Sequence, residues 1–439
     1  MKLSKLAMLA ALACGLTAGQ AMAGNGTIAQ VGCFSDSCDS CDPCGEITCG
    51  CEPVGCDLGC DSGCDSGCDS LGCNLGGLGL CGDCCHDDPF TLFGEYGGIS
   101  VGGWLQMGYH TAALPLFNSR PDEVQLHQAW LYAEKAIDTS CGFDIGGRID
   151  YIYGTDSQDT QAFGIANDHW DNGWDNGADY GHALPQLYVE AGYGDLSVKA
   201  GHFYTIIGWE VVTAPDNFFY SHAYTMYNSE PFTHTGALAT YNATDDLTFY
   251  GGYVMGWDSG FEDNGDAFLG GISAGLTDNL TVTYATVGGR FGDGNINRVD
   301  PGPPATVGRG ENGYMHSIVA DYAVSDNLQY IFQSDLLDTE DIDGATVRDT
   351  FGINQYLIYS INDCWALGTR FEWYQADAGV FNTDNDVYAW TSGINYKPNA
   401  NVIIRPEVRW DWVDGDPTGI LENDDDDQFT FGMDTIFLF

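Results

Sequence analysis

The sequence predicts an all-β fold, a transmembrane antiparallel up-and-down β-barrel of about 16 strands. Three observations predict it. Apolar and polar residues alternate through many segments of about ten residues, tight turns alternate with longer connections, and residues 428–439 form an alternating aromatic strand. Beyond the first 23 residues no apolar run is long enough for a transmembrane helix. A chain that crosses a membrane without such a helix must do so as a closed barrel.

Two segments precede the predicted barrel. Residues 1–23 have the pattern of a secretory signal peptide, in which a basic start and an apolar stretch lead to the small-residue cleavage site Ala21-Met22-Ala23. Ala13-Cys14-Gly15 is an alternative lipoprotein cleavage site, although Ala11 makes it a poor match. Residues 24–95 form a segment rich in Cys, Gly and Asp, expected in the periplasm, with too few aliphatic residues to build a core.

The cysteines are concentrated in that segment, where 14 of the 17 lie between Cys33 and Cys85. Because an exported protein meets an oxidising compartment, disulfides or intermolecular cross-links are the expected state. Zinc binding by the C-x-x-C pairs is the alternative, but the sequence between them is low in complexity. The segment therefore predicts stapling or tethering, and disulfide-linked envelope proteins are left open as partners.

From residue 96 to 439, tight turns rich in Asp, Asn, Gly and Pro join pairs of predicted strands. With a first strand at about 99–110 and a last strand at 428–439, they give 16 strands and eight longer connections. An even count, with short turns at one end and long loops at the other, is typical of outer-membrane barrels. The seven turns lie at residues 138–141, 192–195, 244–246, 277–279, 325–327, 362–364 and 398–401.

Within these strands charged residues share one face and aromatic or aliphatic residues the other. In one strand, Arg405 and Arg409 alternate with Val408 and Trp410. A water-filled lumen would take the charged face and lipid the apolar face, whereas a soluble sandwich would turn its apolar faces inward. Tyrosines before the short turns, and tryptophans such as Trp257 at the loop ends, fit two aromatic girdles.

The strand at residues 428–439 is large and apolar at nearly every second position. As the last strand of a soluble sandwich it would leave an exposed edge that invites aggregation. In a barrel it pairs with the first strand, and the edge disappears. A terminal aromatic with this spacing resembles the signal read by the outer-membrane assembly machinery, which is therefore an expected partner. The predicted assembly-signal residues are Phe431, Met433, Phe437 and Phe439.

The charge balance excludes some partners, since the chain has 63 acidic and 14 basic residues and a net charge of −49. Nucleic acid and anionic lipid are not expected to bind such a chain. Gly98–Gly102 and Gly271–Gly275 match the G-x-S-x-G hydrolase pattern but lie in alternating strands with no helix after them. We therefore predict no enzyme, no catalytic residues and no cofactor. Metal binding by His202, His222 and His234 is considered, but pore histidines without metal are preferred.

The third long connection, residues 205–233, is unusually rich in apolar and aromatic residues for an exposed loop. We expect it to pack against the inside wall of the barrel. Here the sequence resembles the putative β-barrel porin-2 (OmpL-like) family, which is abundant in planctomycetes. That resemblance implies an outer-membrane porin over roughly residues 96–439 and brings no site residues. It is carried by the stretches 201–205, 208–212, 214–222 and 230–236.

The expected function is passive diffusion of small hydrophilic solutes and ions across a bacterial outer membrane, with weak cation selectivity. The alternative is a structural envelope anchor cross-linked through its cysteines. A homo-oligomer is left open. A pore constriction is predicted between basic wall residues and two acidic loop residues, Glu210 and Asp216. The alternative is that the arginines only pair with neighbours such as Glu372 and Glu407. The wall residues are Arg148, Lys199, Arg370, Arg405 and Arg409.

Overall fold

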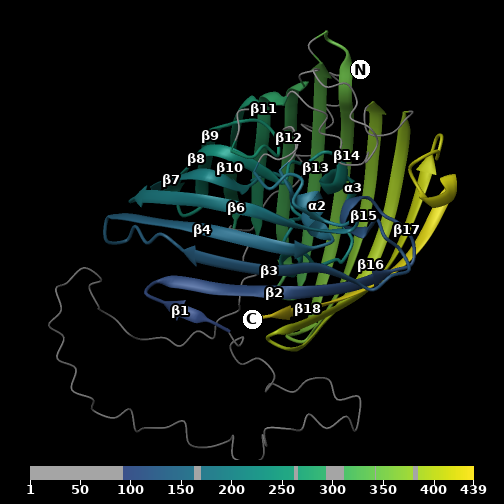
Figure 1. The fold of residues 1–439 in the computed structure, drawn as a ribbon, viewed down its shortest axis with the longest axis horizontal. Helices are drawn as coiled ribbons and strands as arrows, with labels where there is room; N and C mark the ends of the chain where they lie inside the picture. Colours follow the sequence, from purple (N-terminus) through teal and green to yellow (C-terminus); the bar gives the residue numbers. More distant parts are fainter. Residues whose placement is uncertain (1–91, 163–169, 262–264, 293–310, 342, 379–383) are drawn as a thin grey trace, which may run out of the picture.

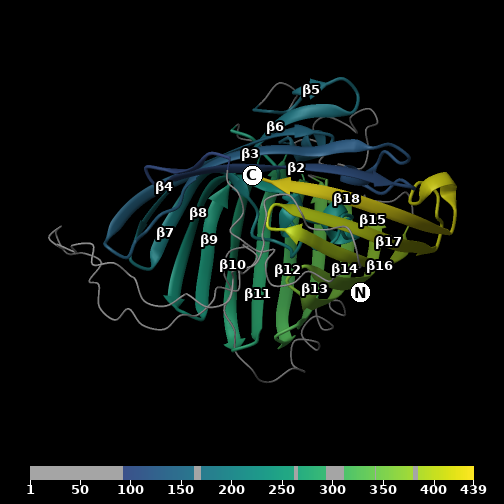
Figure 2. The same cartoon turned by 90° about the horizontal axis from the view of Figure 1, so that it is seen from below.

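The structure is a computed structural model that describes residues 92–439, apart from 163–169, 262–264, 293–310, 342 and 379–383. These residues form a closed antiparallel barrel of 16 long strands (Figure 1), which confirms the predicted fold class. The barrel closes where β18 (Asp427–Leu438) pairs with β2 (Ile99–His110), and Figure 2 shows these strands side by side, β18 in yellow and β2 in blue. In the described part of the chain, no helix is long and apolar enough to cross a membrane.

Sequential strands are neighbours around the wall, and all seven predicted short turns join such pairs. Two additional short strands, β1 (Gly94–Tyr96) and β5 (Asp175–Asn176), extend the edges of β2 and β6. The predicted signal peptide, and the predicted Cys-rich segment up to residue 91, lie outside the described residues. The remaining barrel strands are β3 (Gln125–Lys135), β4 (Phe143–Gly154), β6 (Tyr180–Tyr193), β7 (Leu196–Tyr204), β8 (Thr233–Thr244), β9 (Leu247–Val254), β10 (Asp266–Thr277), β11 (Leu280–Gly292), β12 (Glu311–Ser325), β13 (Leu328–Asp341), β14 (Thr346–Asn362), β15 (Trp365–Ala378), β16 (Asn385–Asn399) and β17 (Val402–Asp414).

One of the eight connections expected to be long is short. Only residues 342–345 separate β13 from β14. The backbone N–H of Asp341 donates to the carbonyl of Ala345 at 2.8 Å, and the N–H of Gly344 donates back to Asp341 at 2.9 Å. Gly344 has a φ of 80°, which a glycine adopts without strain. The connection between β13 and β14 is therefore a tight turn.

The last strand has the two faces that its sequence predicts. Phe429, Phe431, Met433 and Phe437 are 38–58% exposed on the outside of the barrel, whereas Asp434 between them is 1% exposed. At the seam, the backbone N–H of Phe439 donates to the carbonyl of Gly103, and the N–H of Gly103 donates back, both at 2.9 Å. Because β18 pairs with β17 on one side and β2 on the other, no edge is left exposed.

The inner wall is not polar all round. Residues directly opposite each other on adjacent strands point to the same face, and one such row runs from β8 to β14. Its last member, Thr350, is hydrogen-bonded to Ser229 in the connection between β7 and β8, which lies inside the barrel. The row therefore faces inward. The row consists of Leu238, Gly252, Leu269, Val287, Met315, Leu337 and Thr350.

The leucines, Val287 and Met315 of this row pack in one buried cluster with Ile207 and Trp257. Trp257 is 1% exposed, so the expectation that it belongs to an outer aromatic girdle is wrong. A tryptophan at the end of a strand can be stabilised by burial inside the barrel as well as by a position at the membrane interface.

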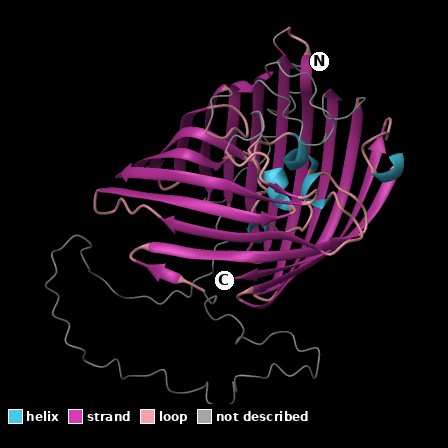
Figure 3. Ribbon diagram, viewed as in Figure 1, coloured by secondary structure: helices cyan, strands magenta, loops and turns pink. Residues whose placement is uncertain are grey.

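The connection between β7 and β8, residues 205–232 and here named L3, lies inside the barrel. It contains two short helical segments, η2 (Ala214–Asp216) and α3 (Tyr224–Asn228). Figure 3 shows the short helices in cyan enclosed by the magenta strands. Every residue from 219 to 232 is buried. L3 and the wall facing it therefore form the core of this protein, which lies within the barrel rather than between two layers.

Candidate functional site

L3 has irregular backbone, and irregular backbone inside a barrel lacks a neighbouring strand to satisfy its N–H and C=O groups. Side chains of the wall take that place. The carboxylate of Glu407 on β17 accepts the backbone N–H groups of Tyr220 at 2.8 Å and Ser221 at 3.1 Å. Glu372 on β15 accepts the N–H of Tyr224 at 2.8 Å. The acidic wall residues thus accept hydrogen bonds from backbone N–H groups of L3.

Three wall arginines hold L3 by its acceptors. Arg370 donates to the carbonyls of Ser221 at 2.8 Å and His222 at 3.2 Å. Arg409 donates to the same His222 carbonyl at 2.7 Å. Arg405 donates to the carbonyls of Ala214, the first residue of η2, at 2.8 Å and of Asn217, which follows η2, at 2.6 Å. These three arginines, which we name the arginine staples, are 0–2% exposed.

Each arginine staple also pairs with carboxylates. Arg370 lies 2.7 Å from Glu372 on its own strand, Arg409 lies 2.8 Å from Asp411, and Arg405 donates to Asp434 at 2.9 Å. The alternative drawn from the sequence was that the arginines pair with neighbours such as Glu372 and Glu407. Glu372 does form such a pair, with Arg370. Glu407 instead bonds the L3 backbone.

Glu210 is the acidic loop residue that meets the staples. Its Oε1 lies 2.6 Å from Nη1 of Arg370, and its Oε2 accepts the backbone N–H of Ala223 at 2.7 Å. Burial alone would raise the pKa of Glu210, but the charge of Arg370, with help from His222, brings it down to about 2. Glu210 is therefore a carboxylate throughout the physiological range, and it locks L3 to β15.

The other three predicted constriction residues lie elsewhere. Arg148 on β4 lies 2.7 Å from Asp150 and 2.9 Å from Glu134, and its side chain is 19% exposed. Lys199 on β7 is half-buried, with its ammonium 4.3 Å from the ring centroid of Tyr188. Asp216 on L3 is exposed. The structure thus places two groups, the staples with Glu210 on one side and Arg148, Lys199 and Asp216 on the other.

Four inward-facing glycines leave room for L3 against the wall. A Cβ added at Gly352 would lie 2.1 Å from the Thr225 side chain, and one at Gly368 would lie 2.2 Å from Phe218. Gly108 and Gly432, on the two strands of the seam, both face Tyr220 in the same way. Glycine at these points permits a close approach that any other residue would block.

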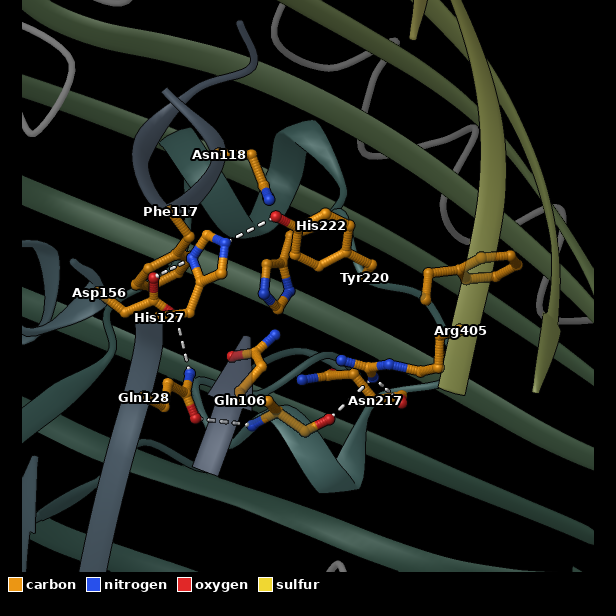
Figure 4. Close-up of a pocket in the computed structure, with 12 residues that line it drawn as sticks. Gln106, Phe117, Asn118, His127, Gln128, Asp156, Asn217, Tyr220, His222 and Arg405 are labelled. Atoms are coloured by element: carbon orange, nitrogen blue, oxygen red, sulfur yellow. Dashed lines mark hydrogen bonds and ion pairs between the residues drawn. The ribbon is translucent and has the colours of Figure 1, made fainter. Parts of the chain in front are cut away.

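A small cavity lies between L3 and the seam (Figure 4), with room for about one water molecule. His127 on β3 joins its two sides, since its Nδ1 lies 2.8 Å from Asp156 and its Nε2 lies 2.6 Å from the hydroxyl of Tyr220. Sequence reasoning missed His127 and Asp156. The signal available for His127 was the adjacent polar pair His127-Gln128, which breaks the alternation of its strand.

The three histidines considered as metal ligands do not form a common site. His202 bonds the hydroxyl of Thr235 at 2.8 Å, His234 bonds the carbonyl of Gly256 at 3.1 Å, and His222 lies 3.3 Å from Glu210. Among the described residues, no group of three or more His, Cys, Asp or Glu side chains is placed to hold a metal.

Buried residues occur on every strand of the wall. Each of the 16 barrel strands contributes at least one of them, and together they form a buried belt. The belt residues are Gln106, Gln128, Asp150, Gln186, Phe203, Leu238, Val254, Leu269, Val287, Met315, Gln333, Asn354, Arg370, Thr391, Arg405 and Asp434.

Comparisons with known proteins agree with this architecture. Residues 98–439 match the family described as "Putative beta-barrel porin-2, OmpL-like". No curated protein matches the sequence. Among solved structures, the trimer form of OmpT from Vibrio cholerae is similar, with a TM-score of 0.52, 11% identity, and 78% of this chain and 99% of that chain covered.

Two further solved structures have the same fold. An anion-selective porin from Comamonas acidovorans gives a TM-score of 0.52 at 10% identity, covering 78% of this chain and 99% of its own. Salmonella typhi OmpF in complex with daunomycin gives 0.53 at 13% identity, covering 78% and 97%. At such low identity the likeness shows the shared barrel fold and nothing finer.

Proposed function

Because the chain belongs to the putative beta-barrel porin-2, OmpL-like family of outer-membrane barrels, we propose that it lets small hydrophilic solutes and ions diffuse passively across the outer membrane. It is a non-enzymatic porin-like barrel. The observation that supports diffusion most directly is the inward face of β3, β4, β6 and β7, where charged side chains such as Arg148 and Lys199 are partly exposed, while phenylalanines and tryptophans cover the outside. Charged groups in that position require water or a partner.

We extend the proposal to weak cation selectivity. Acidic residues outnumber basic ones by 63 to 14, and an acidic surface raises the local concentration of cations at low salt. A homo-oligomer belongs to the same proposal, since a similar structure, OmpT of Vibrio cholerae, is described as a trimer. The Cys-rich segment is proposed to lie in the periplasm, on the side of the short turns.

A second candidate function is supported by the buried belt. If L3 fills the cross-section permanently, the barrel passes no solute and serves as a membrane anchor for the Cys-rich segment. The arginine staples favour this reading, because they bind L3 through buried charge-assisted hydrogen bonds, which are roughly twice as strong as neutral ones.

Single-channel conductance of the full chain in planar bilayers separates the two functions. A pore gives stepwise current increments, whereas an anchor gives none above the background of protein-free bilayers. A matched variant that replaces residues 206–231 with a short Gly/Ser linker removes L3. Larger steps in that variant than in the unaltered chain support a pore narrowed by L3, and steps in the variant alone support the anchor.

A further inference from the structure

The five basic residues of the predicted constriction differ in what they can reach. We infer that Lys199, with Arg148 beside it on the β3–β7 wall, sets the ion selectivity of the pore, and that the three arginine staples do not. This inference rests on the proposed diffusion function and names its selectivity-determining residues. The ligands concerned are small inorganic ions, with Lys199 repelling cations and attracting anions.

The arginine staples do not set the ion selectivity, because they are buried and their charges are neutralised by carboxylates. Their side chains are 0–3% exposed, so a passing ion cannot touch them. Each one also lies within 2.9 Å of a carboxylate oxygen. A compact pair of opposite charges has a field that falls off much faster than that of a single charge. The staples therefore hold L3 in place and contribute little to the field in the water-filled part of the lumen.

Arg148 and Lys199 lie where water reaches. Across the sheet, Glu134, Arg148 and Tyr188 are directly opposite one another, and Glu190 is opposite Lys199. These residues therefore share the inward face of β3, β4, β6 and β7. All five are half-buried rather than buried.

The two cations differ in their partners. The guanidinium of Arg148 is compensated by two carboxylates, Glu134 at 2.9 Å and Asp150 at 2.7 Å. For Lys199, no carboxylate oxygen in the described part of the chain lies within ion-pair distance of the ammonium. Its neighbour Glu190 instead accepts a hydrogen bond from Ser197 at 2.8 Å. Of the two, Lys199 is thus the cation whose charge is less neutralised.

L3 supplies the opposing charge in the same sector. Asp216 is exposed and accepts a hydrogen bond from Thr213 at 2.5 Å, which fixes its carboxylate on η2. The charge of Arg148 acts on this carboxylate. An ion that approaches L3 along this wall therefore passes Asp216 on the loop and the charges of Glu190 and Lys199, which lie side by side on the wall. Such an arrangement of fixed charges is how pores discriminate ions.

The test is the reversal potential of the refolded full chain in a potassium chloride gradient. Lys199→Gln is expected to raise the cation-to-anion permeability ratio by up to about four-fold, because one unit charge about 10 Å away in water changes the local cation and anion concentrations about two-fold each, in opposite directions. Asp216→Asn is expected to lower the ratio. Lys135→Gln is the matched control, because it removes the same charge from a lysine paired with Asp144 at 2.8 Å near the short-turn end of β3.

A permeability ratio in Lys199→Gln that is unchanged, or that moves no more than in Lys135→Gln, overturns the inference while leaving the pore intact. A shift in Arg409→Gln as large as that in Lys199→Gln overturns the exclusion of the staples. If Arg409→Gln does not insert, the comparison of Lys199 with Lys135 still decides. Absence of any conductance in the unaltered chain overturns the diffusion function, and the inference with it.

Discussion

Two sectors of the inner wall hold L3 by opposite means. Strands β15 and β17 hold it with buried ion pairs and charge-assisted hydrogen bonds to its backbone, whereas β8–β13 hold it with an apolar cluster around Ile207 and Trp257. Buried charges fix one geometry but are costly when a partner is lost. Apolar contacts tolerate small shifts but lose energy in proportion to the volume removed. The comparison teaches that L3 is positioned by the polar sector and packed by the apolar one.

Both sectors depend on closure of the barrel, so the largest effect is expected at the seam. Phe437→Asp combined with Phe439→Asp should prevent insertion, because a charge on the lipid face costs up to about 2–4 kcal/mol at mid-depth. Heat-modifiable migration of the protein in outer-membrane fractions measures insertion. Asp427→Asn at the exposed first residue of β18 is the control and should still insert. Normal migration of the double variant would contradict the assembly role of these residues.

The next largest effect is expected in the polar sector. Arg370→Met removes the closest cation from the buried carboxylates of Glu210 and Glu372 and should lower the free energy of unfolding by about 3–5 kcal/mol. Denaturant titration in detergent micelles measures it. The control is Arg120→Met, which breaks a pair with Asp179 whose side chains are 22% and 59% exposed, and should cost less than about 1 kcal/mol. Equal losses in the two variants would mean that the staples contribute no more than a surface pair.

In the apolar sector, Leu269→Ala should cost about 2–4 kcal/mol, since Leu269 is fully buried in the cluster with Trp257. Phe268→Ala, one position along β10, changes a side chain that is 54% exposed on the outside and serves as the control. The same titration measures both. A smaller loss for Leu269→Ala than for Phe268→Ala would show that the cluster is not a core.

The smallest effect is a pH dependence at the end of L3. Nε2 of Gln333 donates at 2.6 Å to both Glu230 and Asp335, which brings two buried carboxyl groups together. Burial, the charge of Asp335 and, more weakly, Glu210 hold the pKa of Glu230 well above its usual value. A raised carboxyl pKa favours the folded state at low pH. That stabilisation is lost as the pH rises through the raised value.

Glu230→Gln should therefore flatten the dependence of the unfolding midpoint on pH over this upper range and stabilise the protein at high pH. Denaturant midpoints across a pH series measure the change. Glu123→Gln at an exposed loop position is the control. An unchanged pH profile in Glu230→Gln would show that this pair does not titrate with unfolding.

The sequence predicted the barrel because alternation and tight turns are local signals. The 16 strands, the seven turns and the outward phenylalanines of β18 follow from residues near one another in the chain. The length of the β13–β14 connection was missed because the residues around Gly344 are polar, as residues in a long loop also are. The connection can be short because Gly344 permits the backbone conformation of a tight turn. The polarity of the surrounding residues does not indicate how long a connection is.

The candidate site could be predicted only in part, because alternation gives two faces and does not say what covers the inner one. Arg148 and Arg370 have the same pattern in sequence, yet one is partly exposed and the other is sealed beneath L3. The bond of Glu407 to the loop backbone and the bond of His127 to Tyr220 join segments about 90 to 190 residues apart. Such contacts depend on where L3 lies within the closed barrel.

The reciprocal hydrogen bonds between Gly103 and Phe439 have a kinetic consequence. Each hairpin joins residues close in sequence, but this contact joins two that are more than 300 residues apart. Bringing such ends together costs about 5 kcal/mol of chain entropy plus a constant. Until the barrel closes, β2 and β18 each offer an unpaired edge that a second chain can also pair with. The rate of closure within one chain does not depend on protein concentration, whereas the rate of pairing between chains does. Dilution should therefore favour the closed barrel during refolding.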